Sequence, residues 1–264
     1  MCECFIIAES SEAIETRFNT EIKDICYEKN YNLSPGQEAH IITCEEPKHL
    51  QLFKFGIIPS ESKKQTPIIN VRTEGDRNAD DDPNYSGAKG IITKPEFRKL
   101  IRSQRCLIIA SAFIIGPKDI GLDEPYLVYL QNKKRPFAIA GIYDSWINSE
   151  GETTNGFAII TTTANELLLK IGSPRMPVIL HENNEQTWLN KNTELTNITR
   201  LLVPYPSNLM NAYPIDLAIK DPQNNYKELI LPKGQRIQPE IEIKLEDRFI
   251  HHGFGYGKKN NDKE

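Results

Sequence analysis

The residue with the most reactive potential stands at the amino terminus, where Cys2 follows Met1. Removal of Met1 would leave a free thiol and a free α-amine on one residue. The pKa of an α-amine is about 7.7–8.0 and that of a free thiol about 8.5, so both groups are partly nucleophilic at neutral pH. Such a 1,2-aminothiol attacks an aldehyde through nitrogen, and its sulfur then closes a thiazolidine ring. It can equally attack an amide carbon with the α-amine as base. The alternative is a cysteine buried on an N-terminal strand, because cysteine is among the most buried residue types.

Composition limits the partners that this chain can have. The 264 residues fit one large domain or two small ones, and 39% hydrophobic with 26% charged residues is typical of a soluble globular protein. The formal net charge of -4 argues against indiscriminate binding of nucleic acid. Any site for a polyanion must therefore be a local basic groove on an acidic protein.

Cysteine spacing and hydropathy exclude several further classes. The five cysteines are odd in number and irregularly spaced, and Cys2-x-Cys4 lacks the usual spacing of zinc ligands. We therefore expect no disulfide framework, metal or cofactor. No apolar run approaches membrane-spanning length, and no basic-then-apolar leader is present. We expect a cytoplasmic monomer without a membrane partner.

The elements that must position Cys2 are mostly short strands. These strands predict one mixed α+β domain over residues 1–250, built on a strongly bent, mostly antiparallel sheet (a pseudo-barrel) with a few flanking helices. Residues 251–264 are predicted to form a flexible tail. Helices are expected at Ser11–Glu28, Lys94–Arg105, Ala164–Ile171 and Asn184–Leu189. Ser10 or Ser11 is the expected N-cap of the first, and Thr162 or Thr163 that of the third. Strands are expected at Met1–Ala8, Ala39–Thr43, Leu50–Ile58, Pro67–Arg72, Cys106–Ile115, Tyr126–Leu130, Phe137–Tyr143, Gly156–Thr163 and Arg175–Leu180.

Two polar segments lie between these elements. Gly75–Gly90 is rich in Asp, Asn and Gly and is expected to be an exposed loop. The basic residues of Lys94–Arg105 are read as a solvated helix face, with phosphate binding as the alternative. Leu201–Tyr205 and Tyr213–Ile219 give weaker strand or turn signals.

Several segments, in this order, resemble the SOS-response-associated peptidase family, also called abasic-site processing proteins. The opening Met-Cys with Phe5 resembles that family's Met-Cys-Gly-Arg-Phe/Tyr, and Asn70–Glu74 matches its Asn-Ala-Arg-x-Glu. No single motif is decisive, but the co-linear order of the motifs over about the first 190 residues makes the resemblance strong. The other matching segments are Tyr31–Gln37, Phe55–Ser60, Arg105–Ile108, Phe137–Tyr143, Ile159–Glu166 and Arg175–Leu180.

This resemblance implies a specific chemistry. Members of the family recognise abasic sites in single-stranded DNA and cross-link to them through the N-terminal Cys as a thiazolidine, and the peptidase label reflects self-removal of the initiator Met. This agrees with the aldehyde chemistry expected of Cys2, because an opened abasic sugar is an aldehyde. The expected partner is therefore single-stranded DNA that carries abasic sites.

The resemblance also assigns roles to individual residues. Cys2 is the nucleophile, and Asn70 stands where the family's Asn would hydrogen-bond the opened sugar or the Cys backbone. Arg72 and Arg175 match arginines that contact DNA phosphates, which suits a planar guanidinium. The structural alternatives are a strand-end Asn in a turn and an arginine paired with a carboxylate such as Glu74. Pairing with Glu74 is expected more of Arg72, its i+2 neighbour.

Two catalytic positions depart from the family pattern. Ile115 replaces a Glu that transfers protons, and Ser173 aligns with a family His. General acid–base groups contribute about 10²–10⁴-fold, so their loss would slow sugar opening or cross-link reversal. Glu74 is the candidate replacement for the missing acid. We therefore take Cys2, Asn70, Glu74 and Ser173 as catalytic candidates, and Arg72 and Arg175 as DNA-binding candidates.

Other departures and two further functions remain open. Glu3 and Cys4 replace the Gly-Arg that follows the nucleophile, and Glu61 stands where the family often has Trp, which removes a base-stacking surface. Cys4 either supplies a second thiol or packs in the core. The alternatives to covalent cross-linking are a weakened relative that only binds single strands, and an N-terminal-nucleophile cysteine hydrolase that cleaves an amide.

Overall fold

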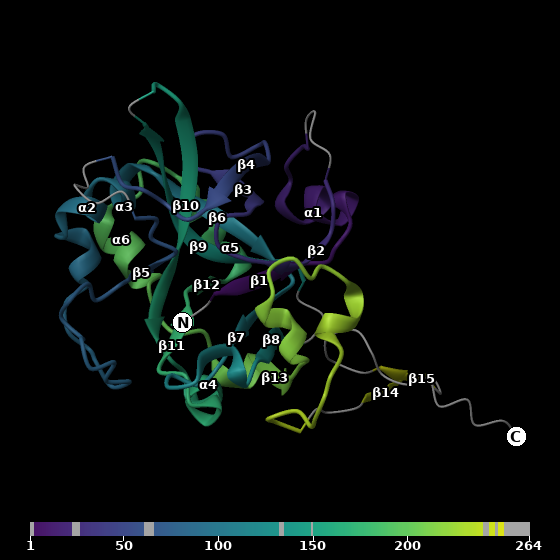
Figure 1. Ribbon diagram of the computed structural model, residues 1–264. Coiled ribbons are helices and arrows are strands. Elements are labelled where there is room, and N and C mark those ends of the chain that lie inside the picture. Colours follow the sequence, from purple (N-terminus) through teal and green to yellow (C-terminus); the bar gives the residue numbers. More distant parts are fainter. Residues whose placement is uncertain are drawn as a thin grey trace, which may run out of the picture.

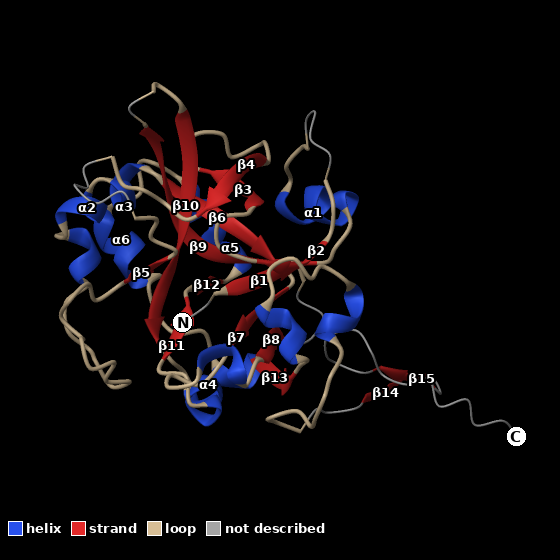
Figure 2. Cartoon of the chain, viewed as in Figure 1, coloured by secondary structure: helices blue, strands red, loops and turns tan. Residues whose placement is uncertain are grey.

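The computed structural model describes residues 3–22, 27–60, 66–131, 135–148 and 150–239, and the backbone of two short strands at 243–245 and 248–250. Strands dominate the molecule, and helices lie around their periphery (Figures 1 and 2). Met1, Cys2 and the predicted tail 251–264 lie outside the described residues. None of the helices that are described is long and apolar enough to cross a membrane.

Five strands close into a barrel. Each pairs with the next, and β10 closes the ring by pairing with β9 on one edge and, in parallel, with β4 on the other. In ring order the strands are β10 (Thr153–Thr163), β4 (Gln51–Phe55), β3 (Glu38–Thr43), β6 (Arg105–Ala110) and β9 (Phe137–Ile147). The predicted α+β class and bent, mostly antiparallel sheet are confirmed.

A second sheet packs against this barrel. Its strands pair antiparallel in the order β13 (Met210–Pro214), β8 (Tyr126–Leu130), β7 (Ala112–Ile115), β1 (Cys4–Ile7) and β2 (Asn30–Leu33). Phe5 of β1 places its ring edge-on to Phe55 of β4 and Phe157 of β10, at centroid distances of 5.5 and 6.4 Å. These contacts join the two sheets through one shared core.

Strand β10 is longer than the barrel wall needs, and its second half carries two short strands. β5 (Asn70–Arg72) runs parallel to Ile159–Thr161, and β11 (Arg175–Pro177) runs antiparallel to Thr161–Thr163. Thr161 is paired with both, opposite Arg72 on β5 and opposite Pro177 on β11. This three-strand edge brings together segments about a hundred residues apart in the chain (Figure 1). β12 (Ile179–Leu180) continues from it onto β9.

The helices are short and anchor on the strands. Trp188 is fully buried, and its indole nitrogen donates to the Cys106 carbonyl at 2.9 Å, which fixes its helix against β6. The α-helices are α1 (Ser11–Phe18), α2 (Pro95–Arg98), α3 (Leu100–Ser103), α4 (Glu166–Ile171), α5 (Glu182–Leu189) and α6 (Leu195–Arg200). The 3-10 turns are η1 (Gly90–Ile92), η2 (Gly121–Asp123), η3 (Ser207–Leu209), η4 (Leu217–Lys220) and η5 (Lys227–Ile230).

Several predicted helix boundaries are wrong. The first helix ends at Phe18 rather than Glu28, because Asn19 adopts a left-handed conformation with φ 51° that terminates it. Its N-cap is Ser10, as predicted. The segment Lys94–Arg105 is two single turns, α2 and α3, and Arg105 already belongs to β6. The N-cap of α4 is Asn165, whose side chain accepts from the Leu168 amide, and not Thr162 or Thr163.

The apolar run Cys106–Ile115 was predicted as one strand, but it is two strands in different sheets. The chain breaks at the buried Ser111. Its amide donates to the Ile6 carbonyl at 2.7 Å, and its hydroxyl accepts from the Ala8 amide at 2.9 Å. These hydrogen bonds tie the corner between the barrel and the second sheet to β1. Helix α6 lies at Leu195–Arg200, where the sequence pattern predicts no element.

Candidate functional site

The predicted nucleophile is the second residue of the chain. Cys2 is outside the described residues, which begin at Glu3. Cys4, the first residue of β1, is buried and packs with Ile6 and Ile114 in the smaller of two hydrophobic clusters. The expectation that Cys4 packs in the core is therefore confirmed. Ile115, at the position of the family's Glu, is fully buried in the main core.

The three-strand edge on β10 positions three of the predicted site residues. Asn70 is the first residue of β5, paired with Ile159, and Arg72 is the last, paired with Thr161. Because side chains alternate along a strand, Asn70 and Arg72 project from one face of β5. Arg175 enters from the other side, as the first residue of β11.

The centre of this cluster is a buried ion pair. Arg175 Nη2 lies 2.9 Å from Glu74 Oε2 and donates also to the Thr161 carbonyl at 2.9 Å. The side chains of Arg175 and Glu74 are only 2% and 1% exposed. If either arginine pairs with Glu74, the sequence favours Arg72, but Glu74 lies beyond the end of β5, where it faces the guanidinium that β11 supplies. The partner of Glu74 is Arg175.

Glu74 is held in place from its backbone side as well. Gly90 packs so closely that a Cβ atom there would lie 2.2 Å from the Glu74 carbonyl oxygen, and the Ile91 amide donates to the Thr73 carbonyl at 3.1 Å. Only glycine fits this approach. The start of η1 thereby fixes the turn that carries Glu74.

The pKa of Glu74 is set by opposing effects. Burial alone would raise the pKa of this carboxyl, but the hydrogen bond and charge of Arg175 outweigh burial, and the pKa lies below its usual range. Glu74 is therefore ionised at neutral pH. It can accept hydrogen bonds or protons there, but it is poorly suited to the proton-donating role of the missing family Glu.

A second carboxylate, Asp81, holds the cations that surround this pair. Asp81 Oδ1 lies 2.9 Å from Arg72 Nη2 and 3.8 Å from Arg175 Nε, and Asp81 Oδ2 lies 3.2 Å from Lys118 Nζ. The Asp81 side chain is 5% exposed. The prediction that Gly75–Gly90 is an exposed loop is therefore wrong at its centre, where Asn78 is buried as well. The acidic run resembled a solvated loop because its partners are distant in sequence.

A partly buried lysine adds to the positive charge. Burial lowers the pKa of Lys89, as does the nearby charge of Arg175, while Glu74 opposes the shift. With Arg72, Lys118 and Arg175 also present, cations outnumber carboxylates in the cluster. The chain therefore has a local basic region despite its formal net charge of -4.

Ser173, which the resemblance aligns with a His, is held by hydrogen bonds to the backbone. Its hydroxyl is buried and donates to the Arg175 carbonyl at 3.0 Å, and its amide donates to the Leu168 carbonyl at the end of α4. These bonds support the entry into β11. A hydroxyl is also a poor general acid or base at neutral pH, so Ser173 positions Arg175 more readily than it transfers a proton.

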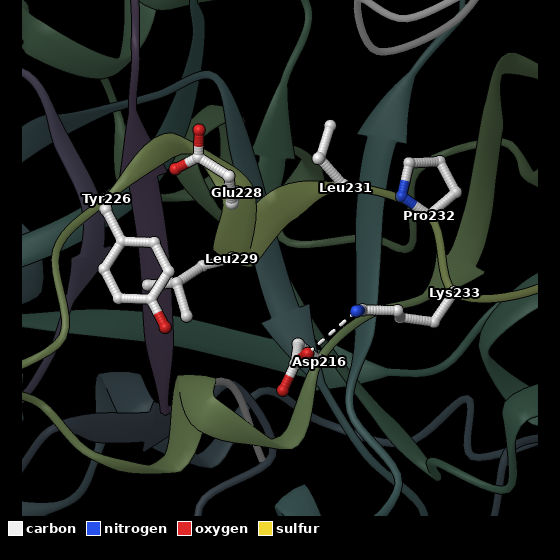
Figure 3. A pocket seen from close by; sticks show the side chains of 7 residues that line it. All are labelled: Asp216, Tyr226, Glu228, Leu229, Leu231, Pro232 and Lys233. Atoms are coloured by element: carbon white, nitrogen blue, oxygen red, sulfur yellow. Dashed lines mark ion pairs between the residues drawn. The ribbon is translucent and has the colours of Figure 1, made fainter.

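Two hollows elsewhere in the described residues contain none of the predicted site residues. One, of about 380 Å³, lies beside η5, and an ion pair of 2.9 Å between Asp216 and Lys233 crosses its rim (Figure 3). The other, of about 280 Å³, is lined by Ile7, His40 and Asn225 among others. No group of three His, Cys, Asp or Glu side chains suited to a metal ion occurs in the part of the chain that is described.

Removing the charge of Glu74 should destabilise the protein strongly. Glu74→Gln leaves the buried Arg175 guanidinium without its counter-charge, and breaking one side of a buried ion pair costs about 3–5 kcal/mol. The matched control is Asp76→Asn, since Asp76 is 82% exposed and pairs with Lys94 on the surface, where such a pair contributes only about 0–1 kcal/mol. Urea unfolding at pH 7 measures both. Equal losses for the two variants would contradict a structural role for the buried pair.

The same pair should make stability depend on acid pH. Because the folded-state pKa of Glu74 lies below its ordinary value of 4.5, its contribution is present above that value and is lost as pH falls through the lower folded-state pKa. The difference in unfolding free energy between wild type and Glu74→Gln should therefore be constant from pH 7 to about 5 and shrink below about 4.5. Denaturant titrations across this range test it, and a constant difference would refute it.

Comparison with known proteins places this geometry in a family. Residues 1–222 match the family described as SOS response associated peptidase (SRAP). Abasic site processing protein YoqW of Bacillus subtilis (strain 168) is 33% identical over 238 residues, which cover 87% of this chain and 99% of that protein. Abasic site processing protein HMCES of Gallus gallus is 24% identical over 247 residues, 82% of this chain and 70% of that protein.

A solved structure agrees with these matches. The crystal structure of a protein from Bacteroides thetaiotaomicron has a TM-score of 0.72 and 25% sequence identity, and the match covers 88% of this chain and 99% of that one. Both sequence and architecture thus match along most of the chain, and the family match over residues 1–222 spans β5, β10 and β11. The chain belongs to the SOS response associated peptidase (SRAP) family.

Proposed function

We propose that this protein binds single-stranded DNA at abasic sites and forms a covalent thiazolidine with them through Cys2 after removal of Met1. The observation that carries the proposal is the basic cluster on β5 and β11, in which Arg72 is partly exposed and Arg175 lies buried, in a chain whose named relatives are abasic site processing proteins. This cluster offers a phosphate backbone a local positive surface on an otherwise acidic molecule.

The bond-forming step balances without a cofactor. The α-amine nitrogen of Cys2 attacks the aldehyde carbon of the opened abasic sugar and loses water to give an imine. The Cys2 sulfur then adds to the imine carbon, and the thiol proton passes to the nitrogen. The five-membered ring holds the protein on the strand, and the reverse sequence releases it.

The described residues supply binding and positioning for this step. Asn70 lies on the same face of β5 as Arg72. A DNA strand bound by Arg72 would therefore lie close to the carboxamide of Asn70. Arg175 is too buried to be a primary phosphate contact, and we assign it to fixing Glu74 and completing the positive region. Glu74, 1% exposed and held ionised, accepts the hydrogen bond of Arg175 and so supports the region from within.

Proton transfer should be the weak step. Ile115 is apolar and fully buried, and the Ser173 hydroxyl is bonded to a backbone carbonyl. Neither can act as a general acid or base, and each such group contributes about 10²–10⁴-fold. We therefore expect the cross-link to form slowly and to reverse slowly.

A denaturing gel tests the covalent reaction. Mature protein is incubated with a single-stranded oligonucleotide that contains one abasic site, and mass spectrometry first establishes whether Met1 is absent. We expect a shifted band that accumulates over hours. Cys2→Ala should abolish the band, whereas Cys4→Ala, the matched control at a buried neighbouring thiol, should retain it.

Two gel results would overturn the covalent mechanism. One is the absence of a shifted band from protein whose free Cys2 terminus has been verified. The other is a band that persists in Cys2→Ala. A retained Met1 would also exclude the reaction, because the α-amine and thiol would then sit on different residues.

The second candidate function is non-covalent binding of single strands, and the residues at positions 115 and 173 favour it. In that case affinity depends on salt, because binding releases counterions from the phosphates. Arg72→Ala should weaken binding and reduce the salt slope by about 0.7, the value for one phosphate contact on a single strand. The control is Arg200→Ala, an exposed arginine on α6. Fluorescence anisotropy at several salt concentrations measures both, and equal behaviour of the two variants would remove Arg72 from the binding surface.

A further inference from the structure

We propose that Asp81 is an internal substitute for a DNA phosphate: its carboxylate occupies an anion position formed by Arg72, Lys118 and Arg175, and a phosphodiester of a bound strand takes that position after Asp81 leaves. The inference rests on the proposed binding of single strands. It adds Lys118 to the binding surface and assigns the loop over residues 75–90 the role of a competitor. This loop follows β5 and lies at the lower left of Figure 1.

Convergence of cations on one carboxylate is the first observation. Arg72, Lys118 and Arg175 come from β5, from the segment after β7 and from β11, and each approaches Asp81 within 4 Å. Arg72 and Arg175 reach Asp81 from the two short strands that flank β10, and Lys118 reaches it from a separate loop. The arrangement of these three cations therefore suits a negatively charged group at its centre.

The fit of the carboxylate is incomplete, and this is the second observation. Asp81 Oδ1 lies 2.9 Å from Arg72 Nη2, yet it makes no aligned hydrogen bond within the described residues. The buried Nε and Nη1 of Arg175 likewise have no hydrogen-bond partner among these residues. Buried donors left without acceptors are costly, so a better acceptor is favoured at this position. Arginine pairs with phosphate through paired, charge-assisted N–H···O bonds, which Asp81 Oδ1 does not make here.

The way the loop is held allows Asp81 to be displaced. Its centre is fixed mainly by polar bonds: Arg72 Nη1 donates to the Asn78 carbonyl at 3.0 Å, and the Asn78 side chain bonds the backbone of Asp82. Asp81 itself has φ 61°, a left-handed conformation that costs free energy for most residues and is tolerated by Asp and Asn. Polar contacts of this kind can be exchanged for those of a competing anion.

The substitute would explain how an acidic protein keeps a basic cluster selective. Free cations on a surface bind many anions weakly. When a carboxylate of the protein already occupies the cations, an external anion binds only if its interaction with them is more favourable than that of the carboxylate, as for a well-placed phosphate. Lys118 is 52% exposed and Arg72 is 29% exposed, so both can reach an incoming strand. Arg175, which is buried, acts from below by supporting the position.

The decisive comparison is Asp81→Asn against Asp80→Asn. Both remove one formal charge from the same loop, but Asp80 is exposed and lies outside the cation cluster. Asn keeps the size of Asp and tolerates the left-handed conformation. Affinity for an undamaged single-stranded oligonucleotide, measured by fluorescence anisotropy, should rise about three- to tenfold more in Asp81→Asn than in Asp80→Asn. Thermal melting verifies that both variants fold.

A second comparison uses Lys118, which is exposed enough to be removed without affecting the core. Lys118→Ala should weaken strand binding about three- to tenfold. The control is Lys191→Ala, since Lys191 is 42% exposed and also pairs with a carboxylate, Glu45, at another surface. This comparison decides the question if Asp81→Asn does not fold.

The outcomes separate this inference from the proposed function. If wild type binds the strand but Asp81→Asn binds no more tightly than Asp80→Asn, the substitution idea is wrong and strand binding stands. Equal affinities of Lys118→Ala and Lys191→Ala would also overturn it. If neither wild type nor any variant binds the strand, the proposed function itself fails.

Discussion

The buried ion pair between Glu74 and Arg175 is the interaction on which the rest of the site depends. Taking two charges out of water is unfavourable unless each finds good partners, and here Arg175 also donates to the Thr161 carbonyl while Ser173 bonds the Arg175 backbone. The pair joins the turn after β5 to the start of β11 across β10. Without it, the cations of the cluster would have no fixed support.

Around this pair the chain arranges charges in layers. Glu74 compensates Arg175 in the interior, and Asp81 compensates Arg72 and Lys118 nearer the surface. The inner pair is nearly inaccessible to solvent, whereas the outer cations are partly exposed. The inner layer therefore suits a structural role and the outer layer suits exchange with an external anion. This separation follows from burial, and it revises the simple view of two equivalent DNA-binding arginines.

Local patterns in the sequence predicted the elements better than their junctions. The strands β8, β9 and β10 and the cap Ser10 follow from side-chain pattern and capping preference, and the α+β pseudo-barrel follows from the number of short strands. The corner at Ser111 could not be predicted in this way, because a polar residue within an apolar run does not indicate that its hydrogen bonds go to β1. The early end of α1 at Asn19 depends on a backbone conformation that helical periodicity does not encode.

The candidate site shows the same limit. Asn70, Glu74, Arg72 and Arg175 are candidates from sequence because they lie in motifs, but the sequence favoured Arg72 as the arginine that could pair with Glu74, whereas the structure pairs Glu74 with Arg175 of β11. Asp81, Lys89 and Lys118 were missed, since each is an ordinary surface residue until the fold brings it to the cluster. In the sequence, Asp81 lies in an acidic loop, Lys89 precedes a turn and Lys118 follows Gly-Pro. Long-range pairing, not residue type, gives them their role.

The account is tested most directly by a crystal structure of the mature protein bound to a single-stranded oligonucleotide with one abasic site. We predict continuous density from Cys2 to the opened sugar, an intact Glu74–Arg175 pair, and a phosphate oxygen in contact with Arg72 and Lys118 where Asp81 now lies. A strand bound elsewhere, with Asp81 still held by its cations, would contradict the account.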